Sequence, residues 1–185
     1  MPTDSIHILL ITGPVGVGKS TVADEVFEIL RKTSTPIALV NFDELTYASP
    51  LNNDPHGTKL GLKNLSAIWQ NYYSLGIRNL IIPYVIEDQE EIERFRSSAP
   101  GSVISVVRLS ASTKTLHERL RARQLGGSLE WHLERADELN SLYANNNLGN
   151  IIINTDNKTI HEVAEEVIST SLQSLIKPYK LDLAN

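Results

Sequence analysis

Cysteine is missing from this sequence of 185 residues, and so are long apolar runs. The absence of cysteine excludes disulfide bonds, thiolate metal sites and cysteine nucleophiles. No run approaches the ~18 consecutive apolar residues that a membrane helix needs, so no membrane span is expected. The first residues lack a basic region followed by an apolar stretch, which predicts no signal peptide and a cytoplasmic location.

An excess of basic charge is missing as well. The chain has 17 lysine and arginine residues against 22 acidic ones, which gives a net charge of −5. Nucleic acids and anionic membranes both favour basic surfaces, so neither is expected as a main partner. The five histidines show no metal-ligand spacing, and no structural zinc site is predicted.

What is present is the composition of a globular protein, with 41% hydrophobic and 21% charged residues. The length is typical of one domain. We predict a single domain over residues 1–176 and a short tail over residues 177–185, because Lys177-Pro178 closes the last helical stretch. The sequence leaves the oligomeric state open.

Short apolar, β-branched runs alternate with longer stretches of helical period, which predicts an α/β fold with a parallel sheet. Strands are expected at Ile6–Ile11, Ile37–Phe42, Leu80–Ile82 or as far as Ile86, Val103–Leu109 and Ile151–Ile153. Helices are expected at Ser20–Lys32, Gly61–Leu75, Glu87–Ser98, Thr113–Gln124, Leu129–Tyr143 and Thr159–Leu175.

Between the first strand and the first helix, the chain satisfies the pattern G-x-x-x-x-G-K-[ST]. The nucleotide-binding residues expected from it are Gly13, Pro14, Val15, Gly16, Val17, Gly18, Lys19, Ser20 and Thr21. Glycines let backbone N–H groups approach phosphate oxygens, and the helix N-terminus points its dipole at the same anion. Lys19 is expected to reach the β and γ phosphates, and the Ser20 hydroxyl to ligate Mg²⁺. The motif therefore predicts binding of ATP with magnesium.

Asp43 ends the second expected strand. In open parallel sheets the ligand crevice lies at the carboxyl ends of the strands, so this carboxylate can face the phosphate site. It could orient or deprotonate an acceptor hydroxyl, or hold a magnesium-bound water. The alternative is a capping role at the start of a helix, which aspartate performs well.

Arg119 and Arg123 are four residues apart and share one helix face, with no acidic residue three or four positions away. Two such guanidinium groups could clamp the transferring phosphoryl group, or form an ordinary solvated basic face. Gly126-Gly127 supplies a hinge, so we expect a lid at about residues 119–135. Arg135 is a weaker candidate because Glu138 can pair with it.

Two loops bear on ligand binding. The connection from Glu44 to Leu60 is longer than most loops in compact domains, and we interpret it as a substrate-side loop, with a disordered connector as the alternative. The segment Asn154–Asn157 follows the last strand and could contact the nucleotide base. Its residues are equally typical of a simple turn.

Taken together, these residues resemble the P-loop small-molecule kinases, such as the adenylylsulfate, gluconate and shikimate kinases and the chloramphenicol phosphotransferase-like group. The resemblance implies a three-layer α/β/α P-loop NTPase fold with five parallel strands in the order 2-3-1-4-5. It also implies transfer of the γ-phosphoryl group to a hydroxyl of a small molecule. Lys19, Asp43, Arg119 and Arg123 would be the catalytic residues, with Asp43 meeting the acceptor and both arginines in the lid.

One feature departs from that family. Many relatives carry an aspartate directly after the third strand as a second support for magnesium, whereas here Ile82 runs into Pro83 and the next carboxylate is Glu87. Either Glu87 substitutes, or magnesium relies on Ser20, Asp43 and water. A nucleoside monophosphate kinase and a nucleotide-binding switch without phosphoryl transfer remain alternatives. A GTPase is disfavoured because the guanine-reading Asn-Lys-x-Asp is absent.

Overall fold

The computed structural model describes residues 6–123, 126–146 and 148–171. Five parallel strands form one sheet in the order β2-β3-β1-β4-β5. Their bounds are β1 Ile6–Thr12, β2 Ile37–Leu39, β3 Asn79–Pro83, β4 Ser102–Ser110 and β5 Ile151–Asn154. The strand order implied by the resemblance is confirmed.

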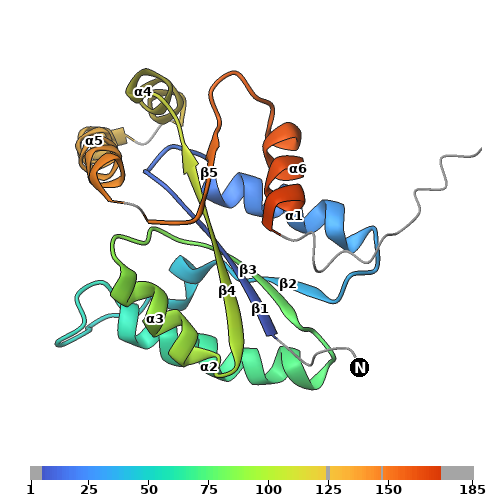
Figure 1. Cartoon of the computed structure of the whole chain (residues 1–185). Helices are drawn as coiled ribbons and strands as arrows, with labels where there is room; N and C mark the ends of the chain where they lie inside the picture. The colour runs from blue at the N-terminus through green and yellow to red at the C-terminus, as the bar shows by residue number, and fades with distance from the viewer. Residues whose placement is uncertain (1–5, 124–125, 147, 172–185) are drawn as a thin grey trace, which may run out of the picture.

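In the described ranges, six α-helices connect and cover the strands. They are α1 Lys19–Arg31, α2 Thr58–Ser74, α3 Gln89–Ser98, α4 Thr113–Ala122, α5 Leu129–Asn145 and α6 Ile160–Ser171. Figure 1 shows α1 and α6 on one side of the sheet and α2 and α3 on the other, with α4 and α5 near the carboxyl end of β4. The three-layer α/β/α prediction is therefore correct.

The two faces of the sheet carry two separate cores, as the alternation of side chains along β1 illustrates. Leu9 and Ile11 belong to the cluster under α1, α4 and α6, while Ile8 and Leu10 belong to the cluster under α2, α3 and α5. All four side chains are almost fully buried. A strand buried on both faces explains why this run is apolar without interruption.

The second expected strand is shorter than the sequence indicated, and the third covers its expected residues without the longer extension. β2 ends at Leu39, because the chain turns at Asn41 into a 3₁₀ helix over Phe42–Leu45. β3 ends at Pro83 and does not extend to Ile86, since proline offers no N–H to continue the ladder.

The long connection expected from Glu44 to Leu60 is also shorter in the structure. The 3₁₀ helix occupies its first residues, and α2 begins at Thr58 instead of Gly61. The expected end of the last helix at Leu175 and the tail after Lys177 lie outside the described residues. In the part of the chain that the structure describes, no helix is long and apolar enough to cross a membrane.

Candidate nucleotide and acceptor site

The phosphate loop connects β1 to α1 at the carboxyl edge of the sheet. Gly13 has φ 141°, and a Cβ placed on it would lie 2.4 Å from the main-chain oxygen of Leu109. Gly18 is the N-cap of α1 with φ 103°, and a Cβ there would meet no atom within 4 Å. The first position thus needs glycine for close packing and the second for its backbone conformation, beside open space at the helix N-terminus. This geometry suits a phosphate group.

Lys19 bends back over the loop. Its ammonium group donates to the main-chain oxygens of Gly13 at 2.9 Å and Pro14 at 3.1 Å. Burial lowers the pKa of Lys19 to about 8, the Asp43 carboxylate opposes this shift, and the Arg123 guanidinium adds to it. Lys19, Asp43 and Arg123 therefore lie close enough to act on one another electrostatically.

Ser20 and Thr21 occupy the first turn of α1, and both are exposed. The Ser20 hydroxyl is thus accessible as the magnesium ligand that the motif predicts. The described residues contain no group of three or more histidine or acidic side chains that could hold a metal ion by themselves. The protein's own contribution to a magnesium site would then be small, as is usual where the phosphates supply most ligands.

A cavity of about 290 Å³ lies beside the phosphate loop, between it, α4 and the start of α6. Its walls include Val17, Arg119, Thr155, Lys158 and Ile160. The mixture of apolar side chains with a few directed polar groups is typical of small-molecule sites. Lys158 and Ile160 carried no motif signal in the sequence, since only the fold brings the start of α6 to the phosphate loop.

Arg119 and Arg123 both line this cavity, but their surroundings differ. Arg119 donates to the main-chain oxygen of Val17 and to both oxygens of Thr155, at distances of 2.9 to 3.1 Å. Arg123 is exposed, and its side chain makes no hydrogen bond or ion pair with any residue that the structure describes. Arg119 is thus fixed in the wall, whereas Arg123 keeps its donors available for a ligand.

The turn predicted for the segment Asn154–Asn157 is present, and its contact with the nucleotide base stays a prediction. The segment is a turn, because Asn154 Oδ1 accepts from the Asp156 N–H at 2.7 Å and Asn157 has φ 58°. That turn also places Thr155 in the cavity wall beside Arg119.

Asp43 lies in the 3₁₀ helix after β2, whose N-cap is Asn41. Asn41 makes no side-chain capping bond, and Asp43 is the second residue of the helix and not its N-cap, so the capping role suggested as an alternative belongs to neither side chain. The residue is exposed, yet nearby protein atoms desolvate its carboxyl and raise its pKa, while Lys19 opposes that shift. A partly desolvated carboxylate next to the phosphate lysine is suited to accept a proton.

Glu87 is engaged by a neighbour. Its carboxylate forms an ion pair with Arg135 of α5, and Arg135 also donates to Glu138 at 3.1 Å. The pairing of Arg135 with Glu138 that the sequence indicated is therefore present. Because the Glu87 carboxylate is paired with Arg135, it is poorly suited to replace, as a magnesium ligand, the aspartate that is absent after β3.

A buried hydrogen-bond network at the root of the phosphate loop escaped the sequence analysis. The Tyr143 hydroxyl lies 2.9 Å from Thr12 Oγ1 and donates to the main-chain oxygen of Ile86 at 2.7 Å. Thr12 Oγ1 in turn accepts from the Ile86 N–H at 2.9 Å. Thr12 is 131 positions from Tyr143 and 74 from Ile86, and Ile86 is 57 positions from Tyr143. No local spacing in the sequence therefore signals their contact. The network ties α5 to the last residue before Gly13.

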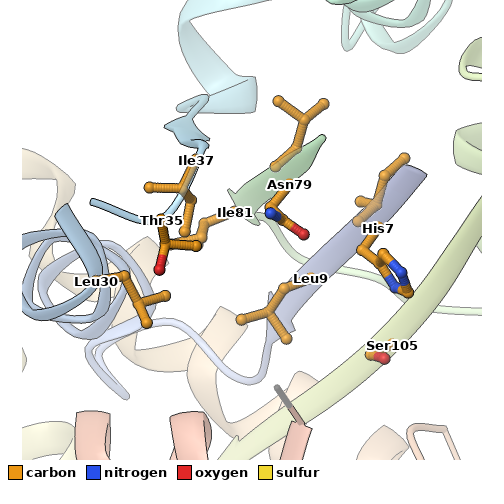
Figure 2. Close-up of a pocket in the computed structure, with 10 residues that line it drawn as sticks. His7, Leu9, Leu30, Thr35, Ile37, Asn79, Ile81 and Ser105 are labelled. Carbon is orange, nitrogen blue, oxygen red and sulfur yellow. The ribbon is translucent and has the colours of Figure 1, made fainter. Parts of the chain in front are cut away.

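A second cavity lies at the opposite, amino-terminal end of the strands (Figure 2). It is lined by His7, Leu9, Asn79 and their neighbours, and its volume is about 10 Å³. That space suits one water molecule, which the buried and otherwise unbonded Asn79 Oδ1 could bind. It is far too small for a nucleotide, so the candidate site is the carboxyl edge of the sheet.

Known proteins share sequence features or the fold with this chain. A family model described as an AAA domain matches residues 9–140, which is more than half of the chain and includes the phosphate loop. No curated protein matches the sequence.

Several solved structures share the fold. A gluconokinase from Sinorhizobium meliloti is 19% identical, with a TM-score of 0.60, over 88% of this chain and 90% of its own. The tunicamycin resistance protein of Deinococcus radiodurans is 23% identical, with a TM-score of 0.61, over 94% and 99%. The APS kinase of Mycobacterium tuberculosis, solved with AMPPNP and APS, is 21% identical, with a TM-score of 0.62, over 89% and 96%. The similarity to P-loop small-molecule kinases drawn from the sequence is therefore confirmed for the fold.

Proposed function

The chain belongs to the AAA domain family, and from that premise we propose that it is an ATP-dependent phosphotransferase acting on a hydroxyl group of a small molecule. The observation that carries the proposal is the placement of Asp43 beside Lys19, which puts a potential base next to the phosphate loop. The APS kinase with the same fold was solved with the ATP analogue AMPPNP, which supports ATP as the donor.

In the proposed reaction, the acceptor oxygen bonds to the γ phosphorus while the bond from that phosphorus to the β–γ bridging oxygen breaks. ADP leaves with the electron pair, and the hydroxyl proton passes to the Asp43 carboxylate and then to solvent. Lys19 and the N–H groups of the phosphate loop stabilise the charge on the phosphates, and Arg123 contacts the transferring group. Bound magnesium, held on the protein side by Ser20, would neutralise phosphate charge and align the two oxygens.

Arg119 has a different role in this proposal. Its three hydrogen bonds to Val17 and Thr155 make it a wall of the nucleotide cavity, so it positions the base side of the nucleotide and not the phosphoryl group. The structure thereby suggests separate tasks for the two arginines that the sequence analysis grouped as one clamp.

One observation favours the alternative of a nucleotide-binding protein without phosphoryl transfer. The aspartate expected after β3 is absent, and Glu87 is held by Arg135. Transfer would then depend on a magnesium ion with weak protein support, and it could be slow. The test below distinguishes the two functions.

The experiment is acceptor-dependent release of ADP from MgATP, with pools of nucleosides, sugars and aminoglycoside- or phenicol-type compounds as acceptors. We expect one pool to stimulate release and Lys19→Ala to abolish it. Asp43→Asn should retain AMPPNP affinity and reduce turnover by about 100-fold or more. Glu44→Gln is the matched control, because this adjacent carboxylate accepts from Asn41 at 2.9 Å and raises the pKa of Asp43, but takes no part in the proposed transfer. Full turnover in Asp43→Asn would contradict the role of Asp43, and nucleotide binding without stimulated turnover would favour the alternative.

A further inference from the structure

The side of the site that must receive the acceptor is built on three aromatic rings. Phe42 precedes Asp43, and its ring centroid lies 4.6 Å from that of Tyr84 and 4.7 Å from that of Phe95. These contacts join the 3₁₀ helix after β2, the segment after β3, and α3. Side chains that follow Phe42 and Tyr84 in the chain therefore lie at the edge of the sheet beside the phosphate loop.

Carboxylates converge on this region. The Glu91 carboxylate accepts from the main-chain N–H of Glu87 at 2.7 Å, three residues after Tyr84. Burial raises the pKa of the Tyr84 hydroxyl, a hydrogen bond with Thr58 lowers it, and the carboxylates of Glu91, Asp43 and Glu87 raise it further. Burial also raises the pKa of Glu91, and Asp88 and Glu87 raise it further. Carboxylates from the 3₁₀ helix, from the segment after β3 and from α3 thus act together on the Tyr84 hydroxyl.

Positive charge in the same region is already used. Arg135 is paired with Glu87 and Glu138, and Lys19 serves the phosphate loop. Arg94, the basic neighbour of Glu91, is paired with Glu90 at 2.8 Å. In contrast, the Asp43 carboxylate accepts no hydrogen bond from any residue that the structure describes.

Resting on the proposed phosphotransferase function, we propose that the acceptor is a hydroxyl compound that carries no anionic group and is either uncharged or bears a protonated amine. An anionic acceptor would have to lose its hydration next to these carboxylates, while the proposed reaction assigns Lys19 and Arg123 to the phosphates of the donor and Arg135 is paired with Glu87 and Glu138. Juxtaposed like charges are strongly unfavourable at recognition surfaces, whereas an ammonium group on the acceptor would gain from the same carboxylates.

The test uses acceptors of different charge: glucosamine, glucose and gluconate as one series, and adenosine with adenosine monophosphate as another, together with the aminoglycoside kanamycin. Turnover with each is measured as ADP release from MgATP at one ionic strength. We expect kcat/KM for uncharged or amine-bearing members to exceed that of the anionic members by about 100-fold or more.

A charge-neutralising variant tests whether the carboxylates cause this preference. Glu87→Gln removes a negative charge and releases Arg135, so we expect the preference against anionic acceptors to fall by about tenfold or more. Glu138→Gln is the matched control, since it removes the other, more exposed partner of Arg135 and leaves the pair with Glu87 in place. AMPPNP affinity, measured in each variant, reports whether the fold and the nucleotide site are intact.

The outcomes separate this inference from the function on which it rests. Turnover confined to gluconate or adenosine monophosphate would overturn the inference and leave the phosphotransferase standing. A charge preference that Glu87→Gln and Glu138→Gln reduce equally would also overturn it. AMPPNP binding with no stimulation by any acceptor of either series would overturn the proposed function itself, and the inference with it.

Discussion

Arg119 holds Thr155 by two hydrogen bonds, from Nη1 to the hydroxyl oxygen at 2.9 Å and from Nη2 to the main-chain oxygen at 3.0 Å. A third bond, from Nη1 to the Val17 main-chain oxygen at 3.1 Å, connects the same guanidinium to the phosphate loop. One side chain of α4 thereby joins two loops that are more than 130 residues apart in the chain. The width of the nucleotide cavity depends on that connection.

Removal of this link should weaken nucleotide binding. In Arg119→Ala we expect the Kd for AMPPNP to rise by about 10- to 100-fold, because a hydrogen bond involving a charged group contributes about 1.5–3 kcal/mol. Isothermal titration calorimetry measures the change. Arg121→Ala is the control, since Arg121 is exposed on the same helix and does not line the cavity. Equal losses of affinity in the two variants would contradict the role of Arg119.

Gly13 provides a test of the loop backbone. A Cβ at this position would lie 2.4 Å from the Leu109 oxygen, and φ 141° is strained for any other residue. We expect Gly13→Ala to displace the loop and to reduce AMPPNP affinity by about 100-fold or more. Gly127→Ala is the control, because a Cβ there meets no atom within 4 Å. Unchanged affinity in Gly13→Ala would show that the loop tolerates the displacement.

The parts of the molecule that sequence predicted well are those determined locally. The run from Ile6 to Ile11 is buried on both faces, and the glycines at 13 and 18 occupy backbone conformations that the motif requires. The fold followed from these features together with the alternation of strands and helices.

The parts that sequence missed depend on distant contacts. Tyr143 reaches Thr12 across 131 residues, and Arg119 reaches Thr155 across 36, so neither contact leaves a spacing signal in the chain. The pairing of Glu87 with Arg135 is of the same kind. The spacing on the helix revealed Glu138 as a local partner of Arg135. It could not reveal Glu87, which lies 48 residues away and pairs with the same arginine.

The pKa of Lys19 makes nucleotide binding depend on pH. Burial lowers this pKa from 10.5 to about 8 in the free protein, whereas bound phosphates favour the charged ammonium and raise it again. The complex therefore binds more protons than the free protein above pH 8. Because about half of the free-protein lysine is already neutral at pH 8, affinity for AMPPNP should fall by less than about twofold between pH 7.5 and 8 and then more steeply, by up to about tenfold per pH unit.

The control for this dependence keeps the charge at position 19 fixed. In Lys19→Arg we expect weaker binding overall but no decline between pH 8 and 9.5, because arginine stays protonated throughout that range. Calorimetry in buffers of different ionisation enthalpy also counts the protons taken up on binding. A decline of equal steepness in both proteins would assign the titrating group elsewhere.

The Tyr143 network should contribute to the stability of the whole fold. Its hydroxyl is buried, lies 2.9 Å from Thr12 Oγ1 and donates to the Ile86 oxygen at 2.7 Å. Tyr143→Phe leaves these partners unsatisfied in the core, so we expect the free energy of unfolding to fall by about 1–3 kcal/mol. Urea denaturation measures it, and Tyr47→Phe, at a side chain that is 82% exposed, should change it by less than about 0.5 kcal/mol.

The same network predicts how stability changes in alkali. Burial raises the pKa of Tyr143 from 10.0 to about 12, so between these values the folded state holds a proton that the unfolded state has released. The contribution of Tyr143 is thus complete below pH 10 and is lost as pH rises from 10 toward 12. Tyr143→Phe removes the titrating group, and its unfolding free energy should decline less over that interval than that of the parent protein. Parallel declines in the two proteins would mean that the hydroxyl is ionised as readily in the folded state as in water, which the enclosed contacts with Thr12 and Ile86 do not allow.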